Sequence, residues 1–328
     1  MSTQMNIAII GCGMMGELHA ASASEAGFRI AVCASQPAEA AEVLAKKFDA
    51  EAVADPMAAL RRDDIDAVCI ATPTPTHADY VVAAAEAGKH IFCEKPLGRT
   101  LEQCDQAISA AEENGVKLYV GHVVRYFHEF EAIRAQIDAG KVGKVGFVKT
   151  YRGGISPMGA SGWFRDAKQS GGATLDLLIH DLDWLRYTFG DPERVFSQNL
   201  AGKTSLPIDY VLATLRFSSG VIAQSIGTWA HPAGFRVKAE VCGSGGMIQY
   251  DSHDAPISVM PRETESGPSM IVPASPVNES PYTREWRDFA KWLKGESKPK
   301  VTPEDAKWAV RIALGAIDSA ESGQPVTF

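Results

Sequence analysis

The stretch IAIIGCGMMGELHA, residues 7–20, passes from four apolar residues into a turn that contains Gly11, Gly13 and Gly16. A strand that enters this glycine spacing and continues as a helix is typical of a dinucleotide-binding turn. The first glycine would permit the sharp turn, the second a close approach of pyrophosphate, and the third tight packing of helix on strand. Free N–H groups at the helix start would bind the phosphate, with Met14 and Met15 contributing only backbone atoms. The same spacing also occurs in plain tight bends, so its surroundings must decide.

The surroundings of this turn alternate between short apolar runs and segments with helical spacing up to about residue 122. This alternation predicts a doubly wound α/β domain with a parallel sheet covered on both faces. Beyond it, runs joined by SSG and GSGG turns predict a mostly antiparallel open sheet, arranged as a meander, in a second α/β domain. We expect a Rossmann domain over 1–122 and a substrate-binding and oligomerisation domain over 123–328. The last helix, about 303–320, is expected to pack back on the first domain.

The composition is that of a globular protein of 328 residues with a net charge of -8. Interspersed charges of both signs argue against a nucleic-acid or anionic-membrane partner. The six cysteines form no Cys-x-x-Cys pair, so we expect buried thiols in a reducing compartment and no metal site. No secretory signal is visible at the N-terminus, and a cytoplasmic location is expected.

The turn after the second strand bears on the choice between NAD and NADP. An acidic residue here normally binds the adenosine ribose of NAD, but Ala34, Ser35 and Gln36 occupy this turn, and no acid lies between Glu25 and Glu39. Without that carboxylate a 2′-phosphate is not repelled, and Ser35 could donate to it. No arginine stands beside it, so the sequence leans to NADP without deciding, and Ser35 could equally be an ordinary turn residue.

Two further turns lie at strand ends, where ligands bind in such sheets. In ATPTPTH, residues 71–77, Ala71, Thr72 and Pro73 would run along the cofactor, and His77 begins a helix in a mainly structural role. In CEKPLG, residues 93–98, Glu94 and Lys95 end a strand and would place a cation beside the nicotinamide. The alternative is a solvated turn with a surface lysine.

The stretch SGGATLDLLIHDLDWL, residues 170–185, places Asp176 and His180 four residues apart in a predicted regular helix. Such residues share one helix face. His180 could instead be a buried structural histidine. Asp181 and Asp183 are expected to cap the helix or face solvent. A metal site formed with them is disfavoured because the three side chains point in diverging directions.

Taken in order, these motifs resemble the Gfo/Idh/MocA oxidoreductases, a family that includes glucose-fructose oxidoreductase and inositol 2-dehydrogenase. The matching stretches are IIGCGMMG, CIATPTPTHADYVVAAAEAGKHIFCEKPLGRTLEQC and WFRDAKQSGGATLDLLIHDLDWLRYTFG. The resemblance implies Lys95, Asp176 and His180 as catalytic residues and commonly a cis Lys95–Pro96 bond. Many NAD-using members carry an aspartate after the second strand, where this chain has Ala34 and Ser35.

The expected activity is NAD(P)-dependent hydride transfer to or from a carbinol carbon of a sugar, polyol or inositol. His180 would take the hydroxyl proton, Lys95 would stabilise the developing charge on oxygen, and Asp176 would orient either group. The expected substrate-binding set is Lys95, Arg125, Tyr151, Trp163, Asp176 and His180, with Arg152, Phe164 and Arg165 also nearby. The alternatives are a dihydrodiol dehydrogenase-like or biliverdin reductase-like enzyme, and a non-catalytic NAD(P)-sensing regulator. An open sheet face favours a homodimer or homotetramer.

Overall fold

The computed structural model describes residues 4–156, 162–200, 209–254 and 279–328. The chain forms two compact units, Met1–Tyr126 with Ser275–Trp308, and Phe127–Ala274 with Ala309–Phe328. The sequence assigns everything after residue 122 to the second domain, whereas a late segment, 275–308, clusters with the first unit. The long helix α10 (Pro303–Ser322) crosses the division at residue 308.

The first unit is built on a six-stranded, wholly parallel sheet in the order β3-β2-β1-β4-β5-β6. Its strands are β1 (Asn6–Ile10), β2 (Arg29–Ala34), β3 (Glu51–Val53), β4 (Ala67–Ile70), β5 (His90–Glu94) and β6 (Leu118–Gly121). This order confirms the predicted doubly wound domain. Successive strands are added on one side of β1 up to β3 and on the other side from β4 onward, so the strand order reverses between β1 and β4. The sequence pattern missed β3, because two of its three residues are exposed and the strand lacks an apolar run.

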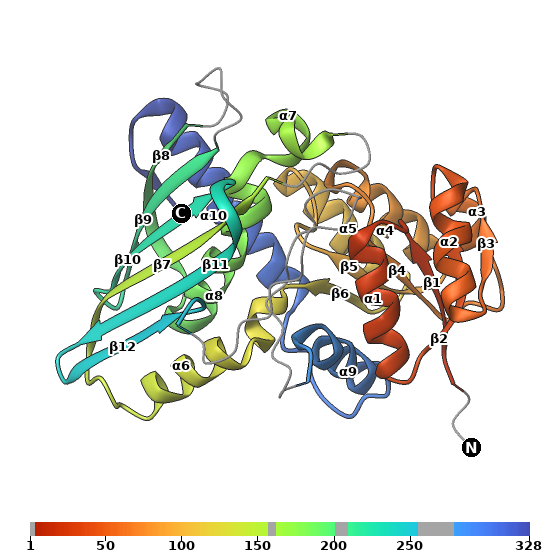
Figure 1. Cartoon of the computed structure of the whole chain (residues 1–328), viewed down its shortest axis with the longest axis horizontal. Helices are drawn as coiled ribbons and strands as arrows, with labels where there is room; N and C mark the ends of the chain where they lie inside the picture. Colours follow the sequence, from red (N-terminus) through yellow and green to blue (C-terminus); the bar gives the residue numbers. More distant parts are fainter. Residues whose placement is uncertain (1–3, 157–161, 201–208, 255–278) are drawn as a thin grey trace. The chain divides into compact units, whose positions relative to one another are not determined.

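The first unit contains the helices that join these strands and one helix, α9, from late in the chain (Figure 1). They are α1 (Met14–Glu25), α2 (Ala38–Phe48), α3 (Pro56–Leu60), α4 (His77–Glu86), α5 (Leu101–Glu113) and α9 (Pro281–Leu293), with short 3₁₀ turns at Thr74–Thr76 and Val123–Tyr126. Side-chain caps fix two of the starts: Thr100 accepts the N–H of Gln103 before α5, and Asp55 accepts the N–H of Met57 before α3.

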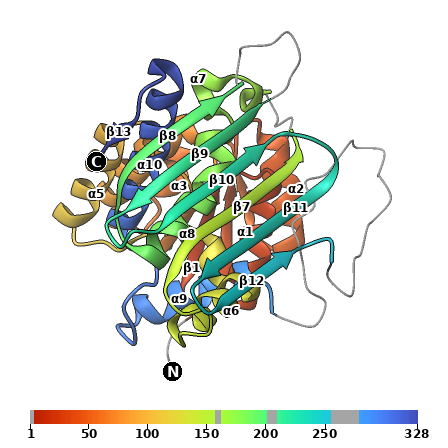
Figure 2. The same cartoon turned by 90° about the vertical axis from the view of Figure 1, so that its left-hand side faces the viewer.

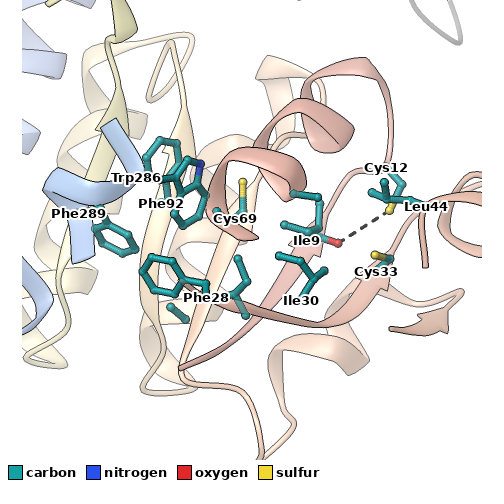
Figure 3. Packing of buried hydrophobic residues seen from close by; sticks show 14 of the residues in the cluster. Ile9, Cys12, Phe28, Ile30, Cys33, Leu44, Cys69, Phe92, Trp286 and Phe289 are labelled. Atoms are coloured by element: carbon teal, nitrogen blue, oxygen red, sulfur yellow. Dashed lines mark hydrogen bonds between the residues drawn. The ribbon is translucent and has the colours of Figure 1, made fainter. Parts of the chain in front are cut away.

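The aromatic core of the first unit joins the central sheet to α9 (Figure 3). The ring of Phe92 on β5 stacks on the indole of Trp286, with centroids 4.3 Å apart and planes 11° apart. Phe28 and Phe289 pack against the same indole. Burying each large apolar side chain stabilises the fold by about 1.5–3 kcal/mol. The burial of Trp286 therefore explains why α9, distant in sequence, clusters with the Rossmann strands.

The second unit contains a seven-stranded mixed sheet in the order β12-β11-β7-β10-β9-β8-β13, seen face on in Figure 2. Its strands are β7 (Val145–Ile155), β8 (Pro192–Asn199), β9 (Tyr210–Phe217), β10 (Ile222–Thr228), β11 (Ala230–Gly243), β12 (Gly246–Asp251) and β13 (Val326–Thr327). All pairings are antiparallel except β7 with β10. The large, mostly antiparallel sheet is confirmed. A simple meander is wrong, because β7 separates β10 from β11 by pairing with both.

The remaining described elements of the second unit are helical: α6 (His128–Asp138), a 3₁₀ turn at Trp163–Arg165, α7 (Ala167–Ser170), a π-helical turn at Thr174–Leu178, and α8 (Ile179–Phe189). Most of the loop expected between residues 252 and 282 lies outside the described residues. Within the described ranges, no helix has the length and apolar character to cross a membrane.

Candidate active site

The glycine turn between β1 and α1 has the shape that a phosphate cradle requires. Gly11 has φ +94°, and a Cβ there would lie 2.6 Å from the carbonyl oxygen of Ala71. A Cβ on Gly16 would lie 1.9 Å from the carbonyl oxygen of Gly11. Around Gly13, by contrast, no described atom lies within 4 Å of an added Cβ. Two glycines are thus required by the backbone packing of the turn, whereas the space at Gly13 is open to a ligand.

The start of α1 offers donors to that space. Gly13 is the N-cap residue of α1 and, as a glycine, has no side chain that could bond the first N–H groups of the helix. Met14 is 45% exposed at this end, and the use of only its backbone by the site stays a prediction. The helix dipole adds positive potential at the same point. This arrangement fits the pyrophosphate of a dinucleotide.

The turn after β2 holds Ser35 and Gln36. Ser35 is buried, and its N–H donates to the carbonyl of Val53 on β3 at 3.3 Å. Gln36 is exposed and forms a cis peptide bond with Pro37 just before α2. Neither residue has a carboxylate, so this turn lacks the acidic residue that usually binds the adenosine ribose of NAD.

The turn after β4 is organised by His77. Its Nε2 lies 2.8 Å from the carbonyl oxygen of Thr72, and its Nδ1 lies 2.7 Å from that of Pro96. The ring therefore ties this turn to the one after β5. Burial lowers the pKa of His77, while its hydrogen bonds to the two carbonyls oppose that shift. The structural role expected of His77 agrees with these contacts. Ala71 and Thr72 are half-buried and Pro73 is exposed along the same turn.

The turn after β5 contains the Glu94–Lys95–Pro96 sequence. Glu94 is buried, and its Oε2 accepts the backbone N–H of Lys95 at 3.0 Å. Burial opposes ionisation of Glu94, but the hydrogen bond from His19 and nearby positive charge lower its pKa overall. Lys95 is half-buried, and the Lys95–Pro96 bond is cis. Three turns thus lie at the carboxyl end of the parallel sheet: the glycine turn after β1, the Thr72 turn after β4 and the Lys95 turn after β5, three strands that are consecutive in the sheet.

Arg125 lies on the 3₁₀ turn after β6 and is almost fully buried. Its Nη1 donates to the carbonyl of Lys300 at 2.8 Å and to Oδ2 of Asp305 at 3.1 Å. These contacts hold Lys300, just before α10, and Asp305, in the first turn of α10, within the first unit. A contact between Arg125 and substrate stays a prediction.

In the second unit, Asp176 and His180 lie on a helix that begins with a π turn. Asp176 lies within Thr174–Leu178 and is buried, and His180 lies in the first turn of α8 and is half-buried. The prediction of a regular α-helix is therefore wrong for this turn, whose hydrogen bonds have π spacing. Such single π turns occur frequently at functional sites.

The expectation that Asp181 and Asp183 cap the helix or face solvent is wrong, because both side chains are buried. Asp181 accepts from Arg152 on β7, at 2.6 Å from Nε and 3.3 Å from Nη2. Burial raises the pKa of Asp181, and the guanidinium of Arg152 opposes that shift. The pair ties α8 to the sheet. Arg152 thus has a structural partner in addition to the hydroxyl contact predicted for it.

The other residues expected to face substrate in the second unit lie on the sheet and beside it. Tyr151 on β7 is half-buried, and burial raises its pKa. Trp163 is half-buried in a 3₁₀ turn, stacked on Phe164 with centroids 3.9 Å apart. Their contacts with substrate stay predictions. Across the described ranges, no three His, Cys, Asp or Glu side chains gather as a metal-binding group.

Two residues near these motifs have roles that the sequence reading did not identify. Asp209, just before β9, accepts the N–H of Ala173 through Oδ2 at the start of the π turn. Burial raises the pKa of Asp209, and the charge of Asp176 adds to this effect. A lone aspartate outside any motif gives no sequence signal. The other residue, His19 on α1, bonds to Glu94, and its position within the opening glycine stretch could have drawn attention to it.

Comparison with known proteins agrees with this geometry. Residues 5–122 match the oxidoreductase family with an NAD-binding Rossmann fold, and residues 130–249 match the GFO/IDH/MocA C-terminal domain. The chain is 31% identical to scyllo-inositol 2-dehydrogenase (NAD(+)) of Bacillus subtilis, covering 99% of this chain and 97% of that protein. It is 28% identical to myo-inositol 2-dehydrogenase of Thermotoga maritima, covering 98% of each.

Among solved structures, GenD2 from gentamicin A biosynthesis, in complex with NAD, superposes with a TM-score of 0.88 at 25% identity, covering 99% of this chain and 96% of that one. The two family matches follow one another along the chain and together span more than half of it. The chain therefore belongs to the Gfo/Idh/MocA family of oxidoreductases.

Proposed function

We propose that this protein is an NAD(H)-dependent dehydrogenase that oxidises a secondary alcohol of an inositol-like polyol. The single observation that supports it most is one end of the parallel sheet, where an open glycine cradle follows β1 and the Lys95 turn follows β5, with β4 between these two strands. Nearly full-length similarity to two inositol 2-dehydrogenases supports the substrate class. The bound nicotinamide would supply the hydride acceptor.

The cofactor would be held by backbone groups. The N–H groups that begin α1, from Met14 to Gly16, would bind the pyrophosphate over Gly13. Backbone atoms of Ala71, Thr72 and Pro73 would line the nicotinamide half, and the bond from His77 to the Thr72 carbonyl would keep that turn in place. Glu94 would lie beside the nicotinamide ribose as part of the cofactor-binding site.

The proton chemistry would belong to Lys95, Asp176 and His180. His180 would accept the proton of the reacting hydroxyl, a task suited to imidazole near neutral pH. The Lys95 ammonium would hydrogen-bond the same oxygen and stabilise its developing negative charge. Asp176 would orient the hydroxyl or the imidazole. Trp163 would offer a flat indole face to the polyol ring, with Tyr151 and Arg125 binding further hydroxyls.

The preference between NAD and NADP would depend on Ser35. An NAD-binding family fold and a similar structure in complex with NAD support NAD(H). A turn without a carboxylate would in addition tolerate the 2′-phosphate of NADP. Ser35→Asp should therefore weaken NADP binding by at least about tenfold through like-charge repulsion, with NAD binding retained. Titration of both dinucleotides against wild type and variant measures this.

A homodimer or homotetramer would form through the open face of the second sheet (Figure 2). Phe196, Tyr210 and Ile222 are between 37% and 40% exposed on strands β8, β9 and β10. Covering such side chains would remove apolar surface from water. Light scattering of wild type and Phe196→Glu would test this assembly.

The substrate class is tested with a panel of inositols, sugars and sugar acids, each assayed with NAD and with NADP. We expect inositols with NAD to give the highest kcat/KM. A higher kcat/KM for open-chain sugars or aromatic dihydrodiols would overturn the substrate assignment. Tight NAD binding with no turnover of any compound would point to a regulator in place of an enzyme.

A further inference from the structure

His19 on α1 is fully buried, and both of its ring nitrogens have hydrogen-bond partners. Nδ1 lies 3.0 Å from Nε1 of Trp286, and Nε2 lies 2.6 Å from Oε1 of Glu94. An indole N–H can only donate. Nδ1 is therefore the acceptor and has no proton, so the ring proton resides on Nε2 and is donated to Glu94. Trp286 thus selects one neutral tautomer of His19.

Glu94 completes the connection to Lys95. Its Oε1 accepts from His19, and its Oε2 accepts the backbone N–H of Lys95 at 3.0 Å. Both bonds need an acceptor oxygen, which an ionised carboxylate supplies at each position. The positive charge of Lys95 also favours the ionised form of this carboxylate. Three buried side chains therefore lead from α9, through α1, to the backbone of Lys95.

We propose that His19 is a positioning residue for Lys95, acting through Glu94, and that Trp286 fixes the tautomer in which it does so. This inference rests on the proposed role of Lys95 in the reaction. We call Trp286, His19 and Glu94 the Lys95 relay. The relay also couples Lys95 to α1, whose first turn would bind the pyrophosphate. A displacement of about 1 Å at a reacting group can lower the rate by about a hundredfold.

The relay can be separated from simple packing, because Trp286 also stacks on Phe92. Trp286→Phe keeps an aromatic ring in the core, removes the N–H donor and makes the side chain smaller, a loss of volume that the control variant shares. His19→Gln keeps both an acceptor and a donor, whereas His19→Leu removes both. Trp292→Phe is the matched control, since it makes the same change on the same helix and packs against the same core without contacting His19.

The first measurement needs no turnover. We expect ¹⁵N NMR of the full chain to show His19 with Nδ1 unprotonated and Nε2 protonated. In Trp286→Phe, the ¹⁵N resonance of Nδ1 should shift, because Nδ1 loses its hydrogen-bond donor. Trp292→Phe should keep the wild-type pattern. A wild-type Nδ1 that carries the proton would overturn the relay whether or not the protein is a dehydrogenase.

The second measurement separates positioning from folding, and it uses variants that retain the wild-type circular dichroism. His19→Leu should lower kcat by roughly 10- to 100-fold, with KM and NAD affinity nearly unchanged, and His19→Gln should restore most of that loss. Equal losses in both variants, or a wild-type kcat in His19→Leu, would overturn the proposal while leaving the dehydrogenase assignment intact. If His19→Leu does not fold, the ¹⁵N pattern of His19 in wild type and in Trp286→Phe decides.

Discussion

Replacing Gly13 with alanine tests the phosphate cradle at its centre. Gly13 has φ -78° and ψ -166°, which alanine adopts without strain, and its added Cβ would meet no described atom within 4 Å. The free energy of unfolding should therefore change by less than about 1 kcal/mol. The new methyl group would occupy the space through which the pyrophosphate approaches the N–H groups of α1.

The magnitude follows from the bonds that would be lost. A hydrogen bond to a charged group contributes about 1.5–3 kcal/mol, so losing one such bond should raise the Kd for NAD by roughly 10- to 100-fold. Calorimetric titration of NAD, beside urea unfolding of the same samples, measures both quantities. A folded Gly13→Ala protein that binds NAD as tightly as wild type would refute the cradle.

Gly16→Ala is the contrasting variant. Its Cβ would lie 1.9 Å from the carbonyl oxygen of Gly11, a backbone atom that can move only with the turn. We expect the free energy of unfolding to fall by about 1–3 kcal/mol, the range typical of overpacking. Weak NAD binding in Gly13→Ala together with loss of stability in Gly16→Ala would separate ligand approach from packing.

Two further predictions concern stability. Burial and the charge of Lys117 lower the pKa of His90, so near and below the unfolded pKa of about 6.5 the unfolded chain binds more protons and the free energy of unfolding decreases as pH falls. In His90→Asn, whose amide oxygen can still accept the N–H of Lys117, urea unfolding should show a smaller decrease between about pH 7 and 5. An equal decrease in both proteins would show that His90 is not its source. Arg152→Met should lower the free energy of unfolding by about 3–5 kcal/mol, because it leaves Asp181 buried and unpaired. The double variant Arg152→Met with Asp181→Leu should regain much of that free energy. If Arg152→Met is as stable as wild type, the pair does not hold α8 to the sheet.

Much of the first unit could be predicted from sequence because its signals are local. The apolar runs before Gly11, Thr72 and Lys95 are buried parallel strands, and their order along the chain implies the sheet. Local patterns could not predict packing between segments that are far apart in the sequence. Trp286 and α9 belong to the Rossmann unit through aromatic packing that no short-range pattern reveals.

The second unit shows the same limit. Alternating residues predicted its strands, but the parallel pairing of β7 with β10 depends on a long crossover between them. Asp181 reads as a polar residue on a helix surface until Arg152, 29 residues earlier, is brought beside it. The π turn that carries Asp176 likewise has no spacing signal, because its local sequence suits a regular helix.

The central claim is tested most directly by the rate of nicotinamide reduction with an inositol as substrate, in wild type and in His180→Ala, with NAD affinity measured on the same preparations. We expect wild-type turnover, a fall of roughly 10²–10⁴-fold in the variant, and equal NAD affinity in both. Unchanged turnover in the variant would remove His180 from the mechanism. Tight NAD binding by the wild-type protein without reduction by any inositol, sugar or sugar acid would contradict the account as a whole.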